Sequence, residues 1–200
     1  MSAKTPRWLI TVSKVISNFF NPITSLVIYF LYYSSEFYTA EGAWEKFLPV
    51  LLILIIPITA WIIWNVKKGN YSNMDVSNRN QRKSLYIFII CVSTIFLLVD
   101  YFLHENLDIT VLYLLLLLVI MHISNYFIKS SMHTALNVYV AALFFAINPT
   151  IGVLWFGIAV IVGATRVIIK RHTIPEVLMG AFLAVVVSFT YLYHNIQNTY

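Results

Sequence analysis

Four residues toward the carboxyl end of the chain have the types and spacing of a histidine-based catalytic site. Thr165 and Arg166 are followed by His172 and then by Glu176, between two strongly apolar stretches. If the segment after His172 is helical, a carboxylate four residues later shares the face of the imidazole. The carboxylate would then hold the Nδ1 proton and leave Nε2 as a nucleophile, the orienting role of the Asp in a Ser-His-Asp triad. Ionisable residues at a membrane boundary are costly and mark functional sites.

The composition indicates that lipid surrounds these residues. The chain is 60% hydrophobic and only 10% charged, which is too few charged residues to cover the surface of a soluble domain. A bilayer core about 30 Å thick needs about 20 helical residues to cross. We therefore predict an all-α fold, a polytopic transmembrane helical bundle of about six to seven spans. The candidate spans are residues 8–33, 47–66, 84–103, 109–128, 134–147, 151–169 and 174–193.

No long linker and no fixed repeat interrupts these spans. We predict one integral membrane domain over residues 1–200, with a motif-bearing core at about 67–180. The first apolar segment is expected to be a retained span, because no small-residue cleavage site stands out after it. Cys91 is the single cysteine, which excludes a disulfide framework and a cysteine-based metal site.

Basic residues are predicted to gather on one membrane face. Because successive spans alternate in direction, residues 1–7, 67–83, 129–133 and 166–173 share a face. Of the 13 Lys and Arg residues, Lys46 is the one expected on the opposite face. The positive-inside rule makes the basic face cytoplasmic, in the cell (inner) membrane.

Three polar segments lie at this face and could form one pocket. They are residues 75–82, 129–134 and 165–176. Their guanidinium groups suit the oxygens of a phosphate, and the turn at Ser131 adds hydroxyl and backbone donors. The segments also hold two imidazoles, His133 and His172. One imidazole could attack phosphorus while the other protonates the leaving oxygen.

At these residues the chain resembles the type 2 phosphatidic acid phosphatase superfamily, the lipid phosphate phosphatases that share a core with vanadium haloperoxidases. The third motif of that family, Ser-Arg-x5-His-x3-Asp, is matched in register, with Thr165 in place of Ser and Glu176 in place of Asp. The second motif, Pro-Ser-Gly-His, reads Ser-Ser-Met-His at residues 130–133.

The first motif of the family, Lys-x6-Arg-Pro, is the most altered. Arg82 matches the arginine, whereas Lys83 replaces the proline and Asp75 stands where the family has its lysine. Arg79 lies one helical turn before Arg82 and could supply the missing cation. Lys129 is expected to be a basic residue at the end of a span, with its ammonium group at the membrane surface.

The resemblance implies a role for each matched residue. His172 would be the nucleophile that forms a phosphohistidine, Glu176 would orient it, and His133 would be the general acid for the leaving alcohol. The groups that would hold the phosphate are Arg82, Arg166, Ser131 and the amide of Met132, to which we add Arg79. No metal or other cofactor is implied, because guanidinium groups and amides meet the charge on the phosphoryl oxygens.

These residues predict a membrane enzyme that hydrolyses a lipid phosphomonoester or diphosphate, with a lipid phosphate and the bilayer as partners and no nucleic acid. One alternative is a phosphotransferase of the same superfamily, which would use the same phosphohistidine. Another is a non-catalytic lipid-binding or transport membrane protein. At single residues the alternative is structural: His172 as an interfacial residue, and Arg79 and Arg82 as charges that set topology.

Overall fold

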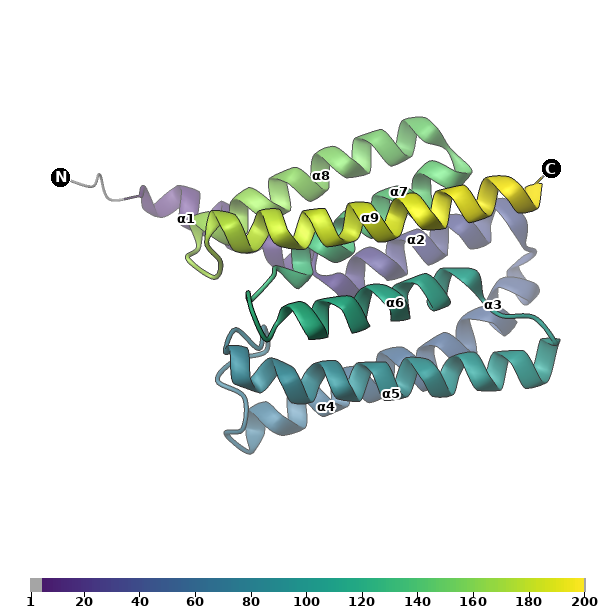
Figure 1. Cartoon of the computed structure of the whole chain (residues 1–200), viewed down its shortest axis with the longest axis horizontal. Coiled ribbons are helices and arrows are strands. Elements are labelled where there is room, and N and C mark those ends of the chain that lie inside the picture. Colours follow the sequence, from purple (N-terminus) through teal and green to yellow (C-terminus); the bar gives the residue numbers. More distant parts are fainter. Residues whose placement is uncertain (1–4, 200) are drawn as a thin grey trace. The chain divides into compact units, whose positions relative to one another are not determined.

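The computed structural model describes residues 5–199, and every regular element in that range is a helix, as predicted (Figure 1). The elements are α1 (Arg7–Phe19), α2 (Pro22–Phe37), α3 (Ala40–Pro49), the π-helical η1 (Val50–Ile55), α4 (Ile56–Lys67), α5 (Arg79–His104), α6 (Ile109–Ser124), α7 (Met132–Ile147), α8 (Pro149–Ile168) and α9 (Ile174–Thr199).

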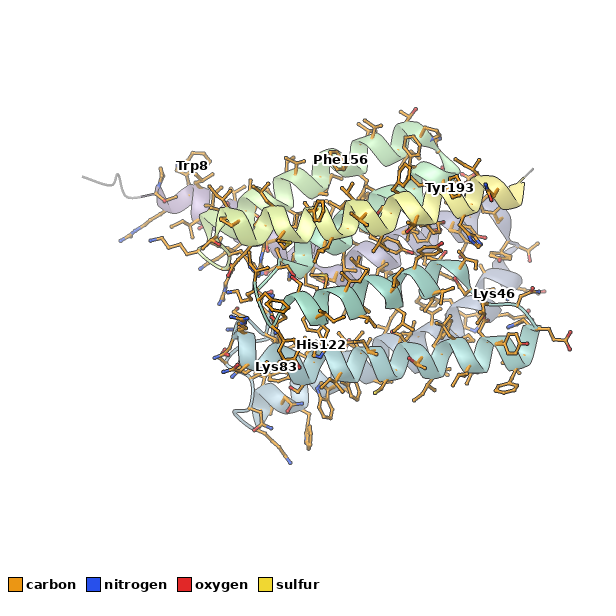
Figure 2. The ribbon with its side chains drawn as sticks, viewed as in Figure 1. Trp8, Lys46, Lys83, His122, Phe156 and Tyr193 are labelled. Atoms are coloured by element: carbon orange, nitrogen blue, oxygen red, sulfur yellow. The ribbon has the colours of Figure 1, made fainter. Side chains whose placement is uncertain are left out.

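Among the described residues, 4 helices are long and apolar enough to cross a membrane. They are Ala40–Lys67, which runs through α3, η1 and α4, then α5, α8, and Ile174–Gln197 of α9. The pair α1 and α2, bent by 53°, raises the number to 5 if it forms one span. Exposed apolar side chains such as Phe156 and Tyr193 project from α8 and α9 (Figure 2). These features indicate a membrane protein.

The predicted count of six to seven spans is not confirmed. Helices α6 and α7 each have 16 residues, which gives a length of about 24 Å against a bilayer core of about 30 Å. Helix α6 ends at Ser124, four residues before the predicted end of its span, and the chain then turns through Asn125.

The chain divides into two compact units. Unit 1 comprises Met1–Tyr29 and Ile128–Tyr200, and unit 2 comprises Phe30–Phe127. Helix α2 runs from the first unit into the second. The second and third predicted motifs therefore belong to unit 1, and the first motif belongs to unit 2.

Unit 1 is built around α7, which packs against α8 and α9, while α1 packs against α8. Helix α7 is buried along its length from Thr134 to Phe144. Two glycines permit the close packing: a Cβ on Gly152 would lie 2.5 Å from the Cα of Phe145, and a Cβ on Gly180 would lie 2.6 Å from the carbonyl oxygen of Ser131. Gly180 thus lets α9 approach the amino end of α7.

Unit 2 is built around α5, which packs against α6, α4 and η1. The π-helical turn lies between Pro49 and Pro57, and neither proline has an N–H group to continue an α-helical ladder. Trp61 of α4 stacks on Phe88 of α5 with ring centres 4.3 Å apart. Asn78 caps the amino end of α5 by accepting the Asn80 N–H.

Candidate functional site

The position of His172 follows from the way α8 ends. Lys170 has a φ of 57°, in the left-handed region. Its N–H donates to the carbonyl of Val167 at 3.0 Å, and the N–H of Arg171 donates to the carbonyl of Arg166 at 3.0 Å. This pair of bonds is the Schellman motif of a helix carboxyl end. The N–H of His172 also donates to the Arg166 carbonyl, at 3.2 Å, so the turn folds the histidine back over the end of α8.

The position of Glu176 follows from the way α9 begins. The N–H of Val177 donates to the carbonyl of Thr173 at 3.1 Å, which makes Thr173 the residue that precedes the first turn. Oε2 of Glu176 accepts the N–H of Thr173 at 3.0 Å. This bond is the glutamate arm of a capping box, in which a Glu three residues into the helix satisfies the N–H of the cap residue.

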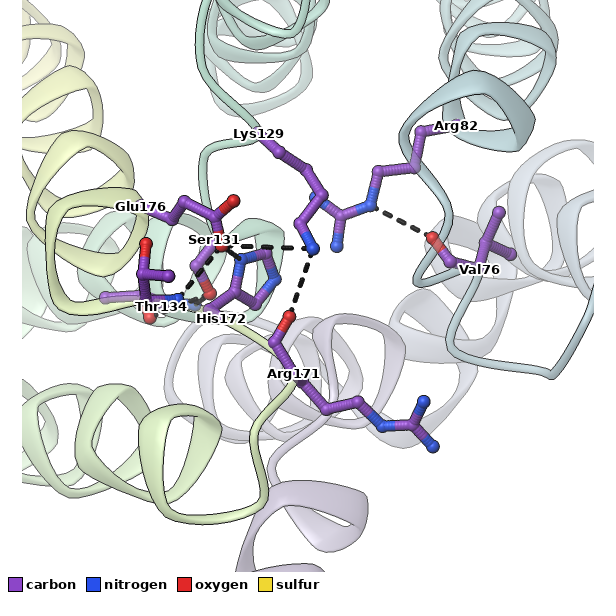
Figure 3. Close-up of polar contacts among 9 residues, drawn as sticks. Val76, Arg82, Lys129, Ser131, Thr134, Arg171, His172 and Glu176 are labelled. Carbon is purple, nitrogen blue, oxygen red and sulfur yellow. Dashed lines mark hydrogen bonds and ion pairs between the residues drawn. The ribbon is translucent and has the colours of Figure 1, made fainter.

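The same carboxylate oxygen also contacts the histidine. Oε2 of Glu176 lies 3.0 Å from Nδ1 of His172 (Figure 3). The His172 side chain is only 1% exposed, and that of Glu176 is 19% exposed. With the Nδ1 proton directed at Glu176, the lone pair of the neutral ring belongs to Nε2. One oxygen therefore both caps α9 and orients the imidazole.

Lys129 is the second basic group at this carboxylate. Its Nζ lies 3.8 Å from Oε2 of Glu176 and donates to the carbonyl of Arg171 at 3.2 Å (Figure 3). The expectation that Lys129 is only a basic span end therefore leaves out its two contacts beside His172.

Arg166 lies inside unit 1, with 1% of its surface exposed. Its Nη1 donates to the hydroxyl of Ser17 in α1 at 2.8 Å, and Ser17 is itself buried. Within residues 5–29 and 128–199, Glu176 is the single acidic residue, whereas the basic residues are Arg7, Lys14, Lys129, Arg166, Lys170 and Arg171. This surplus of positive charge gives the described part of unit 1 an electrostatic preference for anions.

The segment of the second motif starts α7 beside the start of α9. Ser131 caps α7, and its Oγ accepts the Thr134 hydroxyl at 3.0 Å. The Ser131 N–H donates to the backbone carbonyl of Glu176 at 2.9 Å. Met132 and His133 are the first two residues of α7, where helix N–H groups point outward and attract anions. The structure thus brings the second and third motifs together.

The first motif lies in unit 2, where Arg79 joins two helix ends. Nε of Arg79 donates to the carbonyl of Asn125 at 2.6 Å, and its Nη2 donates to the carbonyl of Tyr126. Asn125 returns a bond from its amide to the Arg79 carbonyl at 3.2 Å. These carbonyls follow the last turn of α6, where a cation is favourable. Two donors of Arg79 therefore fasten the start of α5 to the end of α6.

Arg82 is also held within unit 2. It is 2% exposed, and its Nε donates to the carbonyl of Val76 at 3.0 Å (Figure 3). Val76 has a φ of 44°, which is rare for a β-branched residue. The loop is stabilised by Asn73, whose Oδ1 accepts the N–H of Asp75 and the hydroxyl of Ser77, both at 3.1 Å.

Sequence reasoning missed Thr173 and Ser17, and it placed Lys129 at the end of a span without its contacts at the site. The role of Thr173 could have been found, because Thr-Ile-Pro-Glu at residues 173–176 has the spacing of a capping box. The contacts of Lys129 and Ser17 join residues distant in the chain, so no local pattern indicates them.

No group of three or more His, Cys, Asp or Glu side chains placed to hold a metal ion occurs among residues 5–199. A comparison of the chain with protein-family models, with curated proteins and with solved structures finds no match.

Proposed function

We propose that the protein is a membrane phosphatase that hydrolyses a lipid phosphomonoester or diphosphate through a phosphohistidine on His172. The observation that supports this function is the 3.0 Å contact between Nδ1 of the buried His172 ring and Oε2 of Glu176. Capping of α9 needs only the bond from the Thr173 N–H, so the capping box alone does not account for an imidazole on the same oxygen.

The first half of the reaction transfers the phosphoryl group to the protein. The lone pair on Nε2 of His172 attacks phosphorus while the Nδ1 proton stays hydrogen-bonded to Glu176, which stabilises the positive charge that develops on the ring. The bond between phosphorus and the leaving oxygen breaks, and His133 donates the proton that the leaving group needs. The leaving group is the lipid alcohol of a monoester or the lipid monophosphate of a diphosphate.

The second half returns the protein to its starting state. His133, now neutral, takes a proton from a water molecule, and the water oxygen attacks phosphorus. The P–N bond breaks, its electron pair returns to Nε2, and inorganic phosphate leaves. In unit 1, Arg166, Ser131 and the amide of Met132 would meet the charge on the phosphoryl oxygens. Phosphate binding by Arg82 stays a prediction from the first motif, whereas the bonds of Arg79 to the carbonyls of Asn125 and Tyr126 support a structural role for that side chain.

Candidate substrates are phosphatidic acid, phosphatidylglycerol phosphate and a prenyl diphosphate, which present similar anionic phosphate groups.

We propose that the reaction takes place at the cytoplasmic face of the cell membrane, on the basis of the Lys and Arg distribution. Single cysteines at positions 73 and 106, in a chain with Cys91→Ser, test this orientation. Labelling of intact cells at position 106 alone is expected, and labelling at position 73 alone would contradict it.

The function is tested by phosphate release from these lipids in detergent with EDTA present. The native chain should be active, and His172→Ala should lose activity by at least about 1000-fold. His194→Ala, which changes a histidine at the other end of α9, is the matched control and should retain activity. Full activity of His172→Ala would refute the nucleophile, and complete loss on adding EDTA would refute the metal-free mechanism.

A phosphotransferase is distinguished in the same assay. With glycerol or another alcohol present, transfer gives a new phosphate ester in preference to free phosphate. An acid-labile, base-stable ³²P label on the native chain, absent from His172→Ala, is expected in either case because both reactions pass through phosphohistidine.

A further inference from the structure

Lys129 contacts two groups beside His172: the backbone carbonyl of Arg171 and the carboxylate of Glu176. The ammonium group donates to the carbonyl of Arg171, the residue that precedes His172. It also lies 3.8 Å from Oε2 of Glu176. Lys129 belongs to the connection that leads to α7, so these contacts tie that connection to the turn between α8 and α9 at the point where the imidazole is oriented.

The position of this ammonium group has an electrostatic consequence. Oε2 of Glu176 is contacted by Nδ1 of His172, by the N–H of Thr173 and by Nζ of Lys129. The Lys129 and Glu176 side chains are 20% and 19% exposed, so water screens the pair less than it screens a surface ion pair. A cation beside Glu176 offsets the attraction of the carboxylate for an imidazolium, and this favours the neutral ring.

Three other cationic side chains belong to the end of α8 and the turn after it. The guanidinium group of Arg171 points away from the imidazole (Figure 3), and that of Arg166 contacts Ser17 in α1. Lys170, in the same turn, is exposed. His133, in the first turn of α7, is the titratable side chain of the second motif.

We propose that Lys129 is a positioning residue that holds Glu176 in place and keeps His172 neutral, with its lone pair on Nε2, at lower pH than the His172 and Glu176 pair alone would allow. As a consequence for catalysis, which rests on the function proposed above, Lys129 widens the pH range in which the nucleophile is active. It acts through Glu176 and the Arg171 carbonyl, without a contact to substrate.

The test compares Lys129→Met with Lys129→Arg, and uses Lys170→Met as a matched control that removes a positive charge from the same turn. Histidine labelled with ¹³C at Cε1 is followed by NMR in detergent micelles as the pH is changed, and the His172 signal is assigned with His172→Gln. We expect Lys129→Met to raise the midpoint of the His172 titration by about half to one pH unit. Lys129→Arg and Lys170→Met should leave it near the native value.

Kinetics give a second readout. In Lys129→Met the acidic limb of the profile of kcat/KM against pH should move upward with the NMR midpoint, while inhibition by orthovanadate changes by less than about threefold. An unchanged midpoint in Lys129→Met, or an equal shift in Lys170→Met, would overturn the proposal. So would an unchanged acidic limb with vanadate affinity lowered at least tenfold, because Lys129 would then bind phosphate itself.

The NMR experiment does not depend on turnover. If no lipid phosphate is hydrolysed but the midpoint moves in Lys129→Met alone, the proposed function fails and the positioning role of Lys129 stands. If hydrolysis is seen and the midpoint does not move in Lys129→Met, the proposed function stands and the positioning role of Lys129 fails.

Discussion

The turn between α8 and α9 in unit 1 and the start of α5 in unit 2 both have basic side chains beside a helix end. In the turn, the contacts of His172 and Lys129 converge on the carboxylate of Glu176. At the start of α5, Arg79 donates to the carbonyls of Asn125 and Tyr126 after α6, and Arg82 donates to the carbonyl of Val76 in the preceding loop. Carbonyls at a helix end attract cations in any protein, and buried loop carbonyls also need a donor, so the needs of the backbone explain both contacts. These needs do not explain a buried imidazole held by a carboxylate.

The difference shows how to judge a charged residue that a motif singles out. Donors that satisfy helix carbonyls support a structural role, and a titratable ring with an orienting partner supports a chemical one. Substitutions in the two units test this distinction.

Glu176→Gln separates capping from catalysis. Glutamine in this position can still accept the Thr173 N–H, but it carries no charge to stabilise an imidazolium. We expect kcat to fall roughly 10²- to 10⁴-fold with little change in the midpoint of unfolding by SDS. Glu176→Ala should lose the cap as well, at a cost of about 1 kcal/mol. Native kcat in Glu176→Gln would mean that Glu176 serves the helix alone.

Arg79→Ala tests the structural role of an arginine that donates to backbone carbonyls. It removes the charged donor from the carbonyls of Asn125 and Tyr126, so we expect unit 2 to lose about 1–3 kcal/mol of stability. Vanadate inhibition should change by less than about threefold. Lys67→Ala, at the exposed end of α4, is the control for loss of a positive charge. A tenfold loss of vanadate affinity at native stability would instead support phosphate binding by Arg79.

Lys170→Gly and Val76→Gly compare the two left-handed residues. Glycine adopts a positive φ at no steric cost, and Lys170 is exposed, so Lys170→Gly should raise stability by about 1 kcal/mol without loss of activity. Val76 is 1% exposed, and loss of its side chain costs about 1.5–3 kcal/mol. We therefore expect Val76→Gly to be neutral or destabilising. SDS unfolding of both variants measures this, and a stabilised Val76→Gly would contradict it.

Asp108 caps α6 by accepting the Val111 N–H. Burial raises the pKa of its carboxyl above the usual value of 3.8. A raised pKa means that the folded protein binds the proton more tightly than the unfolded chain. The resulting stabilisation is complete below the unfolded pKa and is lost as the pH rises through the folded value. Asp108→Asn should keep the cap and flatten the dependence of unfolding stability on pH. An unchanged dependence in the variant would show that the Asp108 carboxyl is not its source.

Local patterns in the sequence predicted the parts of the structure that depend on neighbours in the chain. The all-α fold follows from long apolar runs, and the four-residue spacing of His172 and Glu176 predicted their contact. In the structure His172 lies before α9, and the turn after α8 brings its ring to Glu176. The lengths of the membrane helices could not be fixed, because an apolar run does not show where a helix such as α6 ends. The surroundings of α7 were equally hidden, since residues that face lipid and residues that face other helices are both apolar.

The rest of the candidate site depends on contacts between distant residues. Lys129 and Glu176 lie on different elements, as do Arg166 and Ser17. The spacing within a motif carries no information about such pairs. The partners of Arg79 were missed for the same reason, since they come from the end of α6.

The close approach of Gly180 to the carbonyl oxygen of Ser131 bears on how this protein could change in evolution. Any larger residue at 180 would push α9 away from α7, whether or not a reaction takes place there. Packing therefore constrains the glycine whatever the protein does, whereas the bond of His172 to Glu176 matters to the reaction proposed for it. In a lineage that no longer needed this proposed reaction, another side chain that fits the buried position could replace His172 while Gly180 persisted. A descendant with the glycine and without the histidine would then keep the packing of α7 and α9 without the proposed chemistry.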